Sequence, residues 1–326
     1  MSGPIAVVIP CYRVSRQILG VLGRIGPEVR AVYVVDDACP EHSGDEVRRH
    51  CRDPRVQVLQ HAANLGVGGA VMTGYRQALR DGMRIIVKLD GDGQMDPALI
   101  PRFVAPIAAQ QADYTKGNRF YDLAGVRSMP RGRLAGNALL SLFAKLSTGY
   151  WQLFDVTNGY TAIHARVLQR LPLRRISQRY FFETDMLFRL NTVRAVVVDI
   201  PMDAVYAGET SSLRASRVFG EFLVKHLRNF GKRIFYNYFL RDMTVASLEL
   251  VAGVALLGFG LVVGGVYWAE ALATNRPTPT GTIMLAVVPT IAGLQMLLAF
   301  VAYDVANLPR RPIHGDLPDV PPRDGD

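Results

Sequence analysis

Two long apolar runs in the last third of this 326-residue chain constrain its fold more than any other feature. Residues 250–268 and 282–303 contain no charged side chain, and a helix needs about 20 such residues to cross the hydrocarbon core of a bilayer. The alternative is a pair of helices buried in a soluble core, but uncharged runs of this length are rare in soluble domains. The sequence therefore predicts a membrane hairpin of two helices over residues 244–304.

The charges around this hairpin indicate its orientation. The linker between the runs carries Glu270 and Arg276, whereas the outer flanks are basic and Arg310 and Arg311 follow the second run. Basic flanks stay on the cytoplasmic side, which predicts a multi-pass protein of the inner cell membrane with its N-terminal domain in the cytoplasm. Residues 213–243 mix basic and apolar side chains and are predicted to form amphipathic helices on the membrane surface. The Pro- and Asp-rich residues 305–326 are predicted to be a disordered cytoplasmic tail.

The N-terminal part, residues 1–212, alternates short β-branched runs with stretches of helical length. Strands are predicted at 5–9, 29–35, 56–59, 85–89 and 196–200, and helices at 67–80, 128–150 and 181–190. This order is typical of an α/β domain with a mostly parallel, doubly wound sheet. Ligands of such sheets bind beyond the carboxyl ends of the strands.

Two acidic motifs lie where predicted strands end. Asp90 and Asp92 follow the fourth strand, in the string DGDGQ that also supplies Gln94. Two carboxylates in a tight turn suit Mg²⁺ or Mn²⁺, which prefer oxygen ligands and often share them with substrate phosphates. Asp36 and Asp37 end the second strand, where a carboxylate accepts hydrogen bonds from a nucleobase or from ribose hydroxyls. The alternative for each motif is an acidic turn without a ligand.

The charge and the cysteines bear on partners and compartment. A formal net charge of +9 is typical of proteins that bind nucleic acids, anionic membranes or phosphorylated substrates. The sequence contains no zinc-finger spacing, Lys-rich tail or aromatic RNA-binding run, so we expect no nucleic-acid partner. Cys11, Cys39 and Cys51 form no CxxC pair and are predicted to be reduced thiols.

The motifs taken together resemble one known family. In chain order the strings PCYR, VVDD, NLGVGGA, DGDGQMDP, GNRF and ETD are similar to those of family-2 glycosyltransferases of GT-A fold. Within that family the chain resembles the polyprenyl-phosphate branch, which includes dolichol-phosphate mannosyltransferases and bacterial undecaprenyl-phosphate glucosyltransferases. The resemblance implies a membrane-anchored, inverting enzyme that moves a sugar from a UDP- or GDP-sugar to a polyprenyl phosphate for cell-envelope glycan synthesis. Its cofactor would be Mg²⁺ or Mn²⁺.

The same resemblance implies roles by position. The ligands of the metal and of the donor diphosphate are expected at Asp90, Asp92 and Gln94, with Arg214 near the diphosphate. The nucleotide pocket is expected to contain Pro10, Tyr12, Asp36 and Asp37. The acceptor phosphate is expected at Arg119 and Arg133, with Asn137. The chain departs from the family pattern where PCYR replaces the commoner PxYNE.

Asp185, in the string ETD, distinguishes two kinds of acceptor. In family members that glycosylate a sugar hydroxyl, this Asp is the general base, because a hydroxyl has a high pKa. A lipid phosphate needs no base, since its second pKa of about 6 leaves it mostly ionised at neutral pH. Asp185 is then expected only to order the acceptor site or to pair with an arginine.

Three other functions remain open from the sequence. The first is a glycosyltransferase with a sugar hydroxyl acceptor, as in O-antigen or polysaccharide assembly. The second is a non-catalytic membrane scaffold, although paired carboxylates in DGDGQ have no purpose there. The third is a nucleotidyltransferase, which usually carries a Gly-rich loop after the first strand, where this chain has PCYRVSRQ. The hairpin is also compatible with a homo-oligomer.

Overall fold

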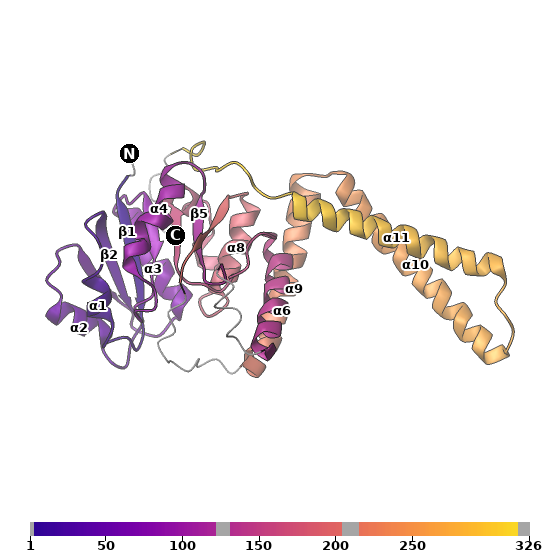
Figure 1. Ribbon diagram of the computed structural model, residues 1–326, viewed down its shortest axis with the longest axis horizontal. Helices are drawn as coiled ribbons and strands as arrows, with labels where there is room; N and C mark the ends of the chain where they lie inside the picture. Colours follow the sequence, from indigo (N-terminus) through magenta and orange to yellow (C-terminus); the bar gives the residue numbers. More distant parts are fainter. Residues whose placement is uncertain (1–2, 122–130, 204–214, 319–326) are drawn as a thin grey trace. The chain divides into compact units, whose positions relative to one another are not determined.

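The computed structural model describes residues 3–121, 131–203 and 215–318 and divides the chain into two compact units (Figure 1). The first, called here the sheet unit, comprises Met1–Phe230 and Pro309–Asp326. The second, called here the hairpin unit, comprises Gly231–Leu308.

The sheet unit is built on a mixed sheet that contains seven strands among the described residues. In chain order they are β1 (Ile5–Cys11), β2 (Val29–Asp36), β3 (Val56–Gln60), β4 (Ile85–Lys88), β5 (Tyr114–Asn118), β6 (Thr161–His164) and β7 (Val197–Pro201). Their order across the sheet is β3-β2-β1-β4-β6-β5-β7. All neighbouring strands are parallel except that β6 is antiparallel to both β4 and β5.

Helices cover both faces of this sheet and create a separate apolar core on each side. Alternate residues of β1 show this division, because Val8 belongs to one core and Val7 to the other. The first core includes residues of α3 (Val67–Arg80) and α8 (Phe182–Thr192), and the second includes residues of α1 (Ile18–Leu22) and α4 (Ile100–Ala108). Burial on both faces explains why the parallel strands read as continuous β-branched runs.

The strands predicted at 5–9, 29–35, 56–59, 85–89 and 196–200 are confirmed, and the helix at 67–80 has the predicted bounds. The sequence did not reveal β5 and β6. The β5 strand, YTKGN, contains no apolar run, and β6 has only 4 residues. Both segments are strands because they pair with neighbouring strands of the sheet, and no local sequence pattern predicts such pairing.

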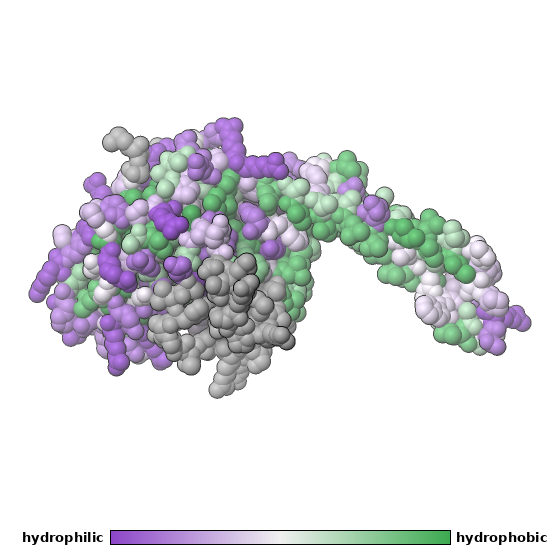
Figure 2. All heavy atoms as spheres, in the orientation of Figure 1, coloured by the Kyte–Doolittle hydropathy of each residue, from purple (hydrophilic) through white to green (hydrophobic). Residues whose placement is uncertain are grey.

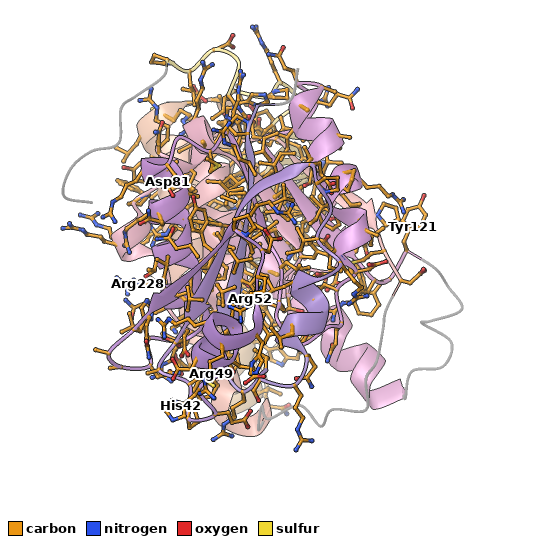
Figure 3. All side chains as sticks on the ribbon, turned by 90° about the vertical axis from the view of Figure 1, so that its left-hand side faces the viewer. His42, Arg49, Arg52, Asp81, Tyr121 and Arg228 are labelled. Carbon is orange, nitrogen blue, oxygen red and sulfur yellow. The ribbon has the colours of Figure 1, made fainter. Side chains whose placement is uncertain are left out.

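The remaining helices of the sheet unit are α2 (Ser43–His50), α6 (Arg131–Thr148), α7 (Ala165–Leu168) and the part of α9 (Ala215–Phe235) before residue 231. His226 of α9 is buried and bonds Ser147 of α6 at 2.8 Å, so these two helices pack together. Exposed basic side chains surround α2, at His42, Arg49 and Arg52 (Figure 3). This part of the positive charge is a solvated face.

The prediction of a disordered tail is wrong for the described residues of the segment that follows the hairpin. The backbone N–H groups of Ile313 and His314 donate to the Asp113 carboxylate, and His314 Nδ1 lies 2.8 Å from it. The His314 ring stacks on His164, with 4.3 Å between ring centroids. Composition suggested disorder, but a few anchoring residues suffice to hold a short segment on a folded surface.

The hairpin unit contains a π-helical turn (Tyr236–Arg241) and the long helices α10 (Val245–Thr274) and α11 (Thr280–Ala306). Among the described residues, these two helices are long and apolar enough to cross a membrane. Figure 2 shows hydrophobic side chains over their visible surface. A side chain at Gly260 or Gly293 would collide with the facing helix, and one at Gly253 would be in tight contact with it, so these glycines permit close packing of α10 on α11.

Candidate active site

The two carboxylates of DGDGQ lie in a loop directly after the central strand β4. The last residue of that strand, Lys88, is buried and places its Nζ 2.7 Å from Asp90 Oδ1. Asp92 Oδ1 accepts a hydrogen bond of 2.9 Å from the Gln94 backbone N–H, and Gly93 between them has φ +80°, which favours glycine. The predicted metal-binding residues Asp90, Asp92 and Gln94 are thus brought together within one tight turn.

The oxygen atoms of this turn are of the kind that a hard divalent cation binds, but they are too few to hold the ion alone. Carboxylate and amide oxygens are the ligands that Mg²⁺ and Mn²⁺ prefer. Among the described residues, however, no group of three or more His, Cys, Asp or Glu side chains could hold a metal by itself. An ion at Asp90 and Asp92 therefore needs further oxygens, such as those of a diphosphate.

The carboxylates of Asp36 and Asp37 are buried and bind protein groups. Asp36 accepts the N–H groups of Cys39 and Gly44, both at 2.8 Å, and so holds the start of α2. Asp37 accepts those of Leu65 and Gly66, at 2.8 and 2.7 Å, next to the Gly-rich start of α3. These contacts agree with the alternative stated for this motif, an acidic turn without a ligand. The role of both residues in nucleotide binding stays a prediction.

Tyr12 offers an aromatic surface at the carboxyl end of β1. It is 44% exposed, although it directly follows a buried strand that includes Pro10. The next residue, Arg13, has φ +59°, and its N–H donates to Cys39 Sγ at 3.1 Å. The Arg13 guanidinium lies 5.4 Å from the centroid of the Tyr12 ring. The Tyr12 ring is therefore accessible at the edge of the sheet where ligands of such folds bind.

Arg119 follows β5 and forms a two-bond ion pair with Asp155. Its Nε and Nη2 donate to the two carboxylate oxygens at 2.8 and 2.9 Å. Burial raises the pKa of Asp155, but the hydrogen bonds and charge of Arg119 outweigh burial and hold that pKa below its usual value. Sequence reasoning missed Asp155, because its partner is distant in the chain and its string, FDVTNG, matches no motif.

Asp185 and Glu183 of the ETD string point to different sides of α8, since two residues turn a helix by about 200°. Asp185 accepts the Ser177 N–H at 2.8 Å and bonds from Arg189 and Asn229 at 3.2 Å. Glu183 instead lies 3.7 Å from Lys88 Nζ, the lysine that pairs with Asp90. The predicted pairing of Asp185 with an arginine is present, and the residue directed toward the DGDGQ loop is Glu183.

Three predicted residues have no described side chain. Arg133 lies in the first turn of α6 and Asn137 in the next, but the placement of their side chains lies outside the described part of the structure. Arg214 lies outside the described residues altogether. Their expected phosphate contacts stay predictions.

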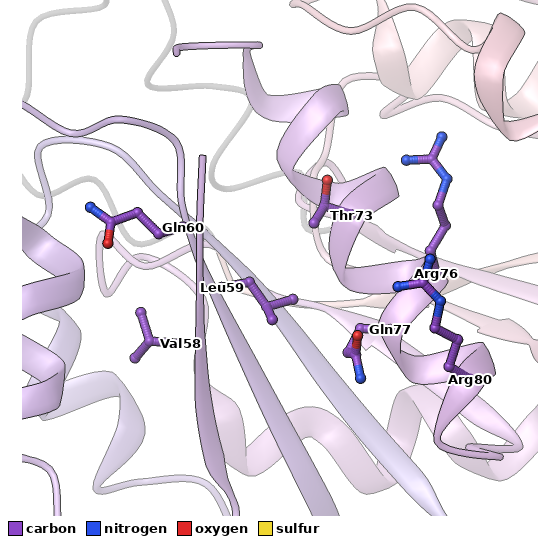
Figure 4. Close-up of a pocket in the computed structure, with 7 residues that line it drawn as sticks. All are labelled: Val58, Leu59, Gln60, Thr73, Arg76, Gln77 and Arg80. Carbon is purple, nitrogen blue, oxygen red and sulfur yellow. The ribbon is translucent and has the colours of Figure 1, made fainter. Parts of the chain in front are cut away.

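A pocket of about 450 Å³ lies elsewhere, between the edge strand β3 and α3 (Figure 4). Its lining includes Thr73, Arg76 and Arg80, and it contains none of the predicted site residues. His61 joins it to the Asp37 loop, with Nε2 2.9 Å from Thr73 Oγ1 and Nδ1 2.8 Å from Asp37 Oδ1.

Comparison with known proteins agrees with this fold. The family model described as Glycosyl transferase family 2 matches residues 6–171. An undecaprenyl-phosphate mannosyltransferase of Micrococcus luteus is 32% identical over 228 residues, which cover 69% of this chain and 93% of that protein. A polyprenol monophosphomannose synthase of Mycolicibacterium smegmatis is 30% identical over 204 residues, which cover 60% of this chain and 75% of that protein.

A solved structure with a similar fold is glucosyl-3-phosphoglycerate synthase of Mycobacterium tuberculosis, in complex with Mn²⁺, UDP and glucosyl-3-phosphoglycerate. The TM-score is 0.54 at 18% sequence identity, and the match covers 70% of this chain and 80% of that chain. At this identity the likeness concerns the fold alone. The predicted GT-A α/β fold is confirmed.

Proposed function

Because this chain belongs to glycosyl transferase family 2, we propose that it moves a sugar from a UDP- or GDP-sugar to a polyprenyl phosphate at a membrane surface. The names of the Micrococcus and Mycolicibacterium relatives support a polyprenyl acceptor. The observation that carries the proposal is the pair Asp90 and Asp92 in a tight turn at the carboxyl end of β4, in a chain that also contains two helices of membrane-spanning length.

The donor site is proposed at this turn. Asp92, Asp90 and Gln94 would hold Mg²⁺ or Mn²⁺ together with oxygens of the donor diphosphate, and the ion would neutralise the charge that develops on the leaving nucleoside diphosphate. The Lys88 ammonium group already forms an ion pair with one oxygen of the Asp90 carboxylate, so this carboxylate has a fixed position in the turn. The exposed ring of Tyr12 supports stacking of the nucleobase at the neighbouring strand end.

The acceptor is proposed to react without a general base. A phosphate oxygen would attack the anomeric carbon on the side opposite to the departing diphosphate, which inverts the configuration. Arg119, whose guanidinium is fixed by Asp155 and one-third exposed, is proposed to orient the acceptor phosphate. Arg133 and Arg214 are proposed to contribute further positive charge.

The connectivity supports an even number of membrane crossings. The chain leaves the sheet unit at α9 and returns to it at Pro309, after α11. If α10 and α11 both cross the bilayer, both ends of the hairpin lie on the side of the sheet unit. The basic flank at Arg310 and Arg311 supports the cytoplasmic side of the inner membrane.

A donor screen tests the proposal. Purified protein in detergent would receive undecaprenyl phosphate, Mn²⁺ or Mg²⁺ and a panel of UDP- and GDP-sugars, and both nucleoside diphosphate release and lipid-linked product would be followed. Metal-dependent lipid product is expected with one donor. Donor hydrolysis without lipid product would contradict the lipid acceptor in favour of a sugar hydroxyl. The absence of turnover with every donor would favour the scaffold.

A further inference from the structure

Four polar residues form a row from the central strand β4 to the edge strand β7, beneath the candidate active site. In register, Lys88 of β4 lies opposite Thr161 of β6, Thr161 opposite Lys116 of β5, and Lys116 opposite Asp199 of β7. Residues directly opposite on paired strands point to the same face of a sheet. Each row residue has an apolar residue two positions away on the same strand and therefore on the same face: Ile86, Ile163, Tyr114 and Val197. These four share a core with residues of α8, so α8 covers this face.

Charge burial in this row is extensive. Lys88 and Lys116 are 1% and 0% exposed, and such lysines are rare unless an opposite charge accompanies them. Lys88 Nζ lies 2.7 Å from Asp90 and 3.7 Å from the largely buried Glu183 of α8. Burial lowers the pKa of Lys116 to about 8, although the charges of Asp155 and Glu183 both act on this lysine and oppose the fall. Burial raises the pKa of Glu183, and the charges of Lys88 and Lys116 oppose this rise. The neighbours Phe182 and Met186 pack in the core and keep the helix in place.

Each lysine is also bound to a loop of the candidate active site. Lys88 Nζ lies 2.7 Å from Asp90 in the DGDGQ loop. Lys116 Nζ donates to the backbone carbonyl of Asn158, in the loop that begins with Asp155. A Cβ on Gly159 would collide with both Lys88 Nζ and Asp90 Oδ2, so this second loop packs directly on the Lys88–Asp90 pair. The two loops therefore meet above the buried lysines.

We propose that Glu183 is a positioning residue. Its carboxylate balances the charges of Lys88 and Lys116, so that these lysines hold the Asp90 loop and the Asp155–Gly159 loop in one arrangement. Through Asp155 the second loop also holds Arg119, which connects the donor loop to the arginine proposed to orient the acceptor. This inference rests on the proposed function only in assigning the nucleoside diphosphate to the Asp90 loop.

The physical reason is the cost of an unbalanced buried charge. Removing one partner of a buried ion pair leaves the other charge without compensation in a medium of low dielectric. If the charge at position 183 is removed, the two buried lysines keep only Asp90 and Asp155 as charged partners, and their side chains shift toward these carboxylates or toward solvent. Either response releases the Asp90 carboxylate or the Asn158 carbonyl from its present position.

Binding of Mn²⁺·UDP and Mn²⁺·GDP to the full chain in detergent tests this, measured by calorimetry. Glu183→Gln, which keeps the size of the side chain and removes its charge, is expected to weaken binding at least tenfold for whichever nucleotide the wild type binds. Glu183→Asp, which keeps the charge, should retain more affinity. Glu28→Gln, at an exposed glutamate, should bind as the wild type does.

The decisive variant is the double substitution Glu183→Gln with Lys116→Met. Lys116→Met by itself removes the bond to the Asn158 carbonyl, so both single variants are expected to weaken binding. Because Glu183 is proposed to act through the lysines, the double variant should bind about as weakly as the weaker of the two single variants. If Glu183→Gln fails to fold, Glu183→Asp, whose shorter side chain moves the carboxylate away from the lysines, replaces it in the same comparison with Lys116→Met.

The outcomes separate this inference from the proposed function. A wild-type chain that binds neither nucleotide would contradict the assignment of the donor site. Wild-type binding that Glu183→Gln leaves unchanged would overturn the positioning role. The same conclusion would follow if the double variant were as weak as the product of the two single effects.

Discussion

Arg119 and Asp155 lie 36 positions apart in the chain and are joined by two hydrogen bonds of 2.8 and 2.9 Å between side chains, with a third of 3.1 Å from the Arg119 backbone N–H to Asp155 Oδ2. Asp155 is almost fully buried, whereas one third of the Arg119 side chain is exposed. A planar guanidinium held by two bonds has a fixed orientation, so Asp155 determines where Arg119 points.

Asp155→Asn is expected to raise the KM for undecaprenyl phosphate about tenfold or more, because a hydrogen bond to a charged group contributes roughly 1.5–3 kcal/mol. Steady-state kinetics with varied acceptor at a saturating donor concentration would measure this. The matched control is Asp53→Asn, since Asp53 binds Arg55 in the same two-bond geometry, with Nε and Nη2 at 3.0 and 2.7 Å, away from the predicted site residues. An unchanged KM in Asp155→Asn would contradict the role of Arg119 at the acceptor.

Asp92→Asn is expected to reduce metal-dependent turnover at least a hundredfold, because an amide has one oxygen and no charge to offer a divalent cation. Titration of Mn²⁺ against the rate of nucleoside diphosphate release would show a raised metal requirement. Asp96→Asn serves as control, because Asp96 lies in the same segment but is exposed and caps the short helix Pro97–Leu99. Equal losses in both variants would indicate damage to the loop and not a metal site.

Asp185→Asn is expected to retain most turnover with undecaprenyl phosphate. The carboxylate already binds Ser177, Arg189 and Asn229, and an ionised phosphate needs no general base. Since Asn preserves the shape but weakens the bond to Arg189, the thermal unfolding midpoint should fall by a few degrees. Complete loss of kcat in a folded variant would instead favour a sugar hydroxyl acceptor.

The stability of the sheet unit is expected to fall as pH drops below about 6.5. Burial, with the charges of His314 and Arg84, lowers the pKa of His164 to about 3, and burial lowers that of His226 to about 4. Between these values and 6.5 the unfolded chain binds protons that the folded chain does not, so each residue reduces stability by up to about 1.4 kcal/mol per pH unit of acidification.

Unfolding at several pH values would test this for His164. Its Nδ1 accepts the Arg166 N–H at 3.2 Å, so His164→Asn keeps an acceptor at the start of α7 and removes the titrating group. The pH dependence should become shallower by about one proton. A steep dependence in His164→Asn equal to that of the wild type would contradict the assignment.

The hairpin unit is expected to depend on a buried ion pair. Arg233 donates to both oxygens of Asp304 at 2.6 and 3.0 Å, and Tyr238 donates to the same carboxylate at 2.6 Å. Arg233→Met should cost about 3–5 kcal/mol because it removes the counter-charge of a buried carboxylate. Arg233→Met combined with Asp304→Leu should recover much of this loss, as measured by thermal unfolding in detergent. A single variant as stable as the wild type would refute the prediction.

The sequence by itself determined the features that depend only on residues close together in the chain. Uncharged runs predicted α10 and α11, β-branched runs predicted β1 to β4, and DGDGQ at the end of a strand predicted where Asp90, Asp92 and Gln94 meet. These features succeed because the hydrophobic period and the turn residues lie within a few positions of one another.

Only the tertiary structure decided which distant residues share a site. Lys88, Lys116 and Glu183 carry charges that would suggest a solvated surface, and the alignment of β4, β6 and β5 with α8 buries them together. Asp155 became the partner of Arg119, and His314 anchored a segment that composition assigned to disorder. Such pairings depend on strand register and packing across the fold. A buried charge is stable only where the whole fold supplies its opposite, and no local sequence pattern encodes that position.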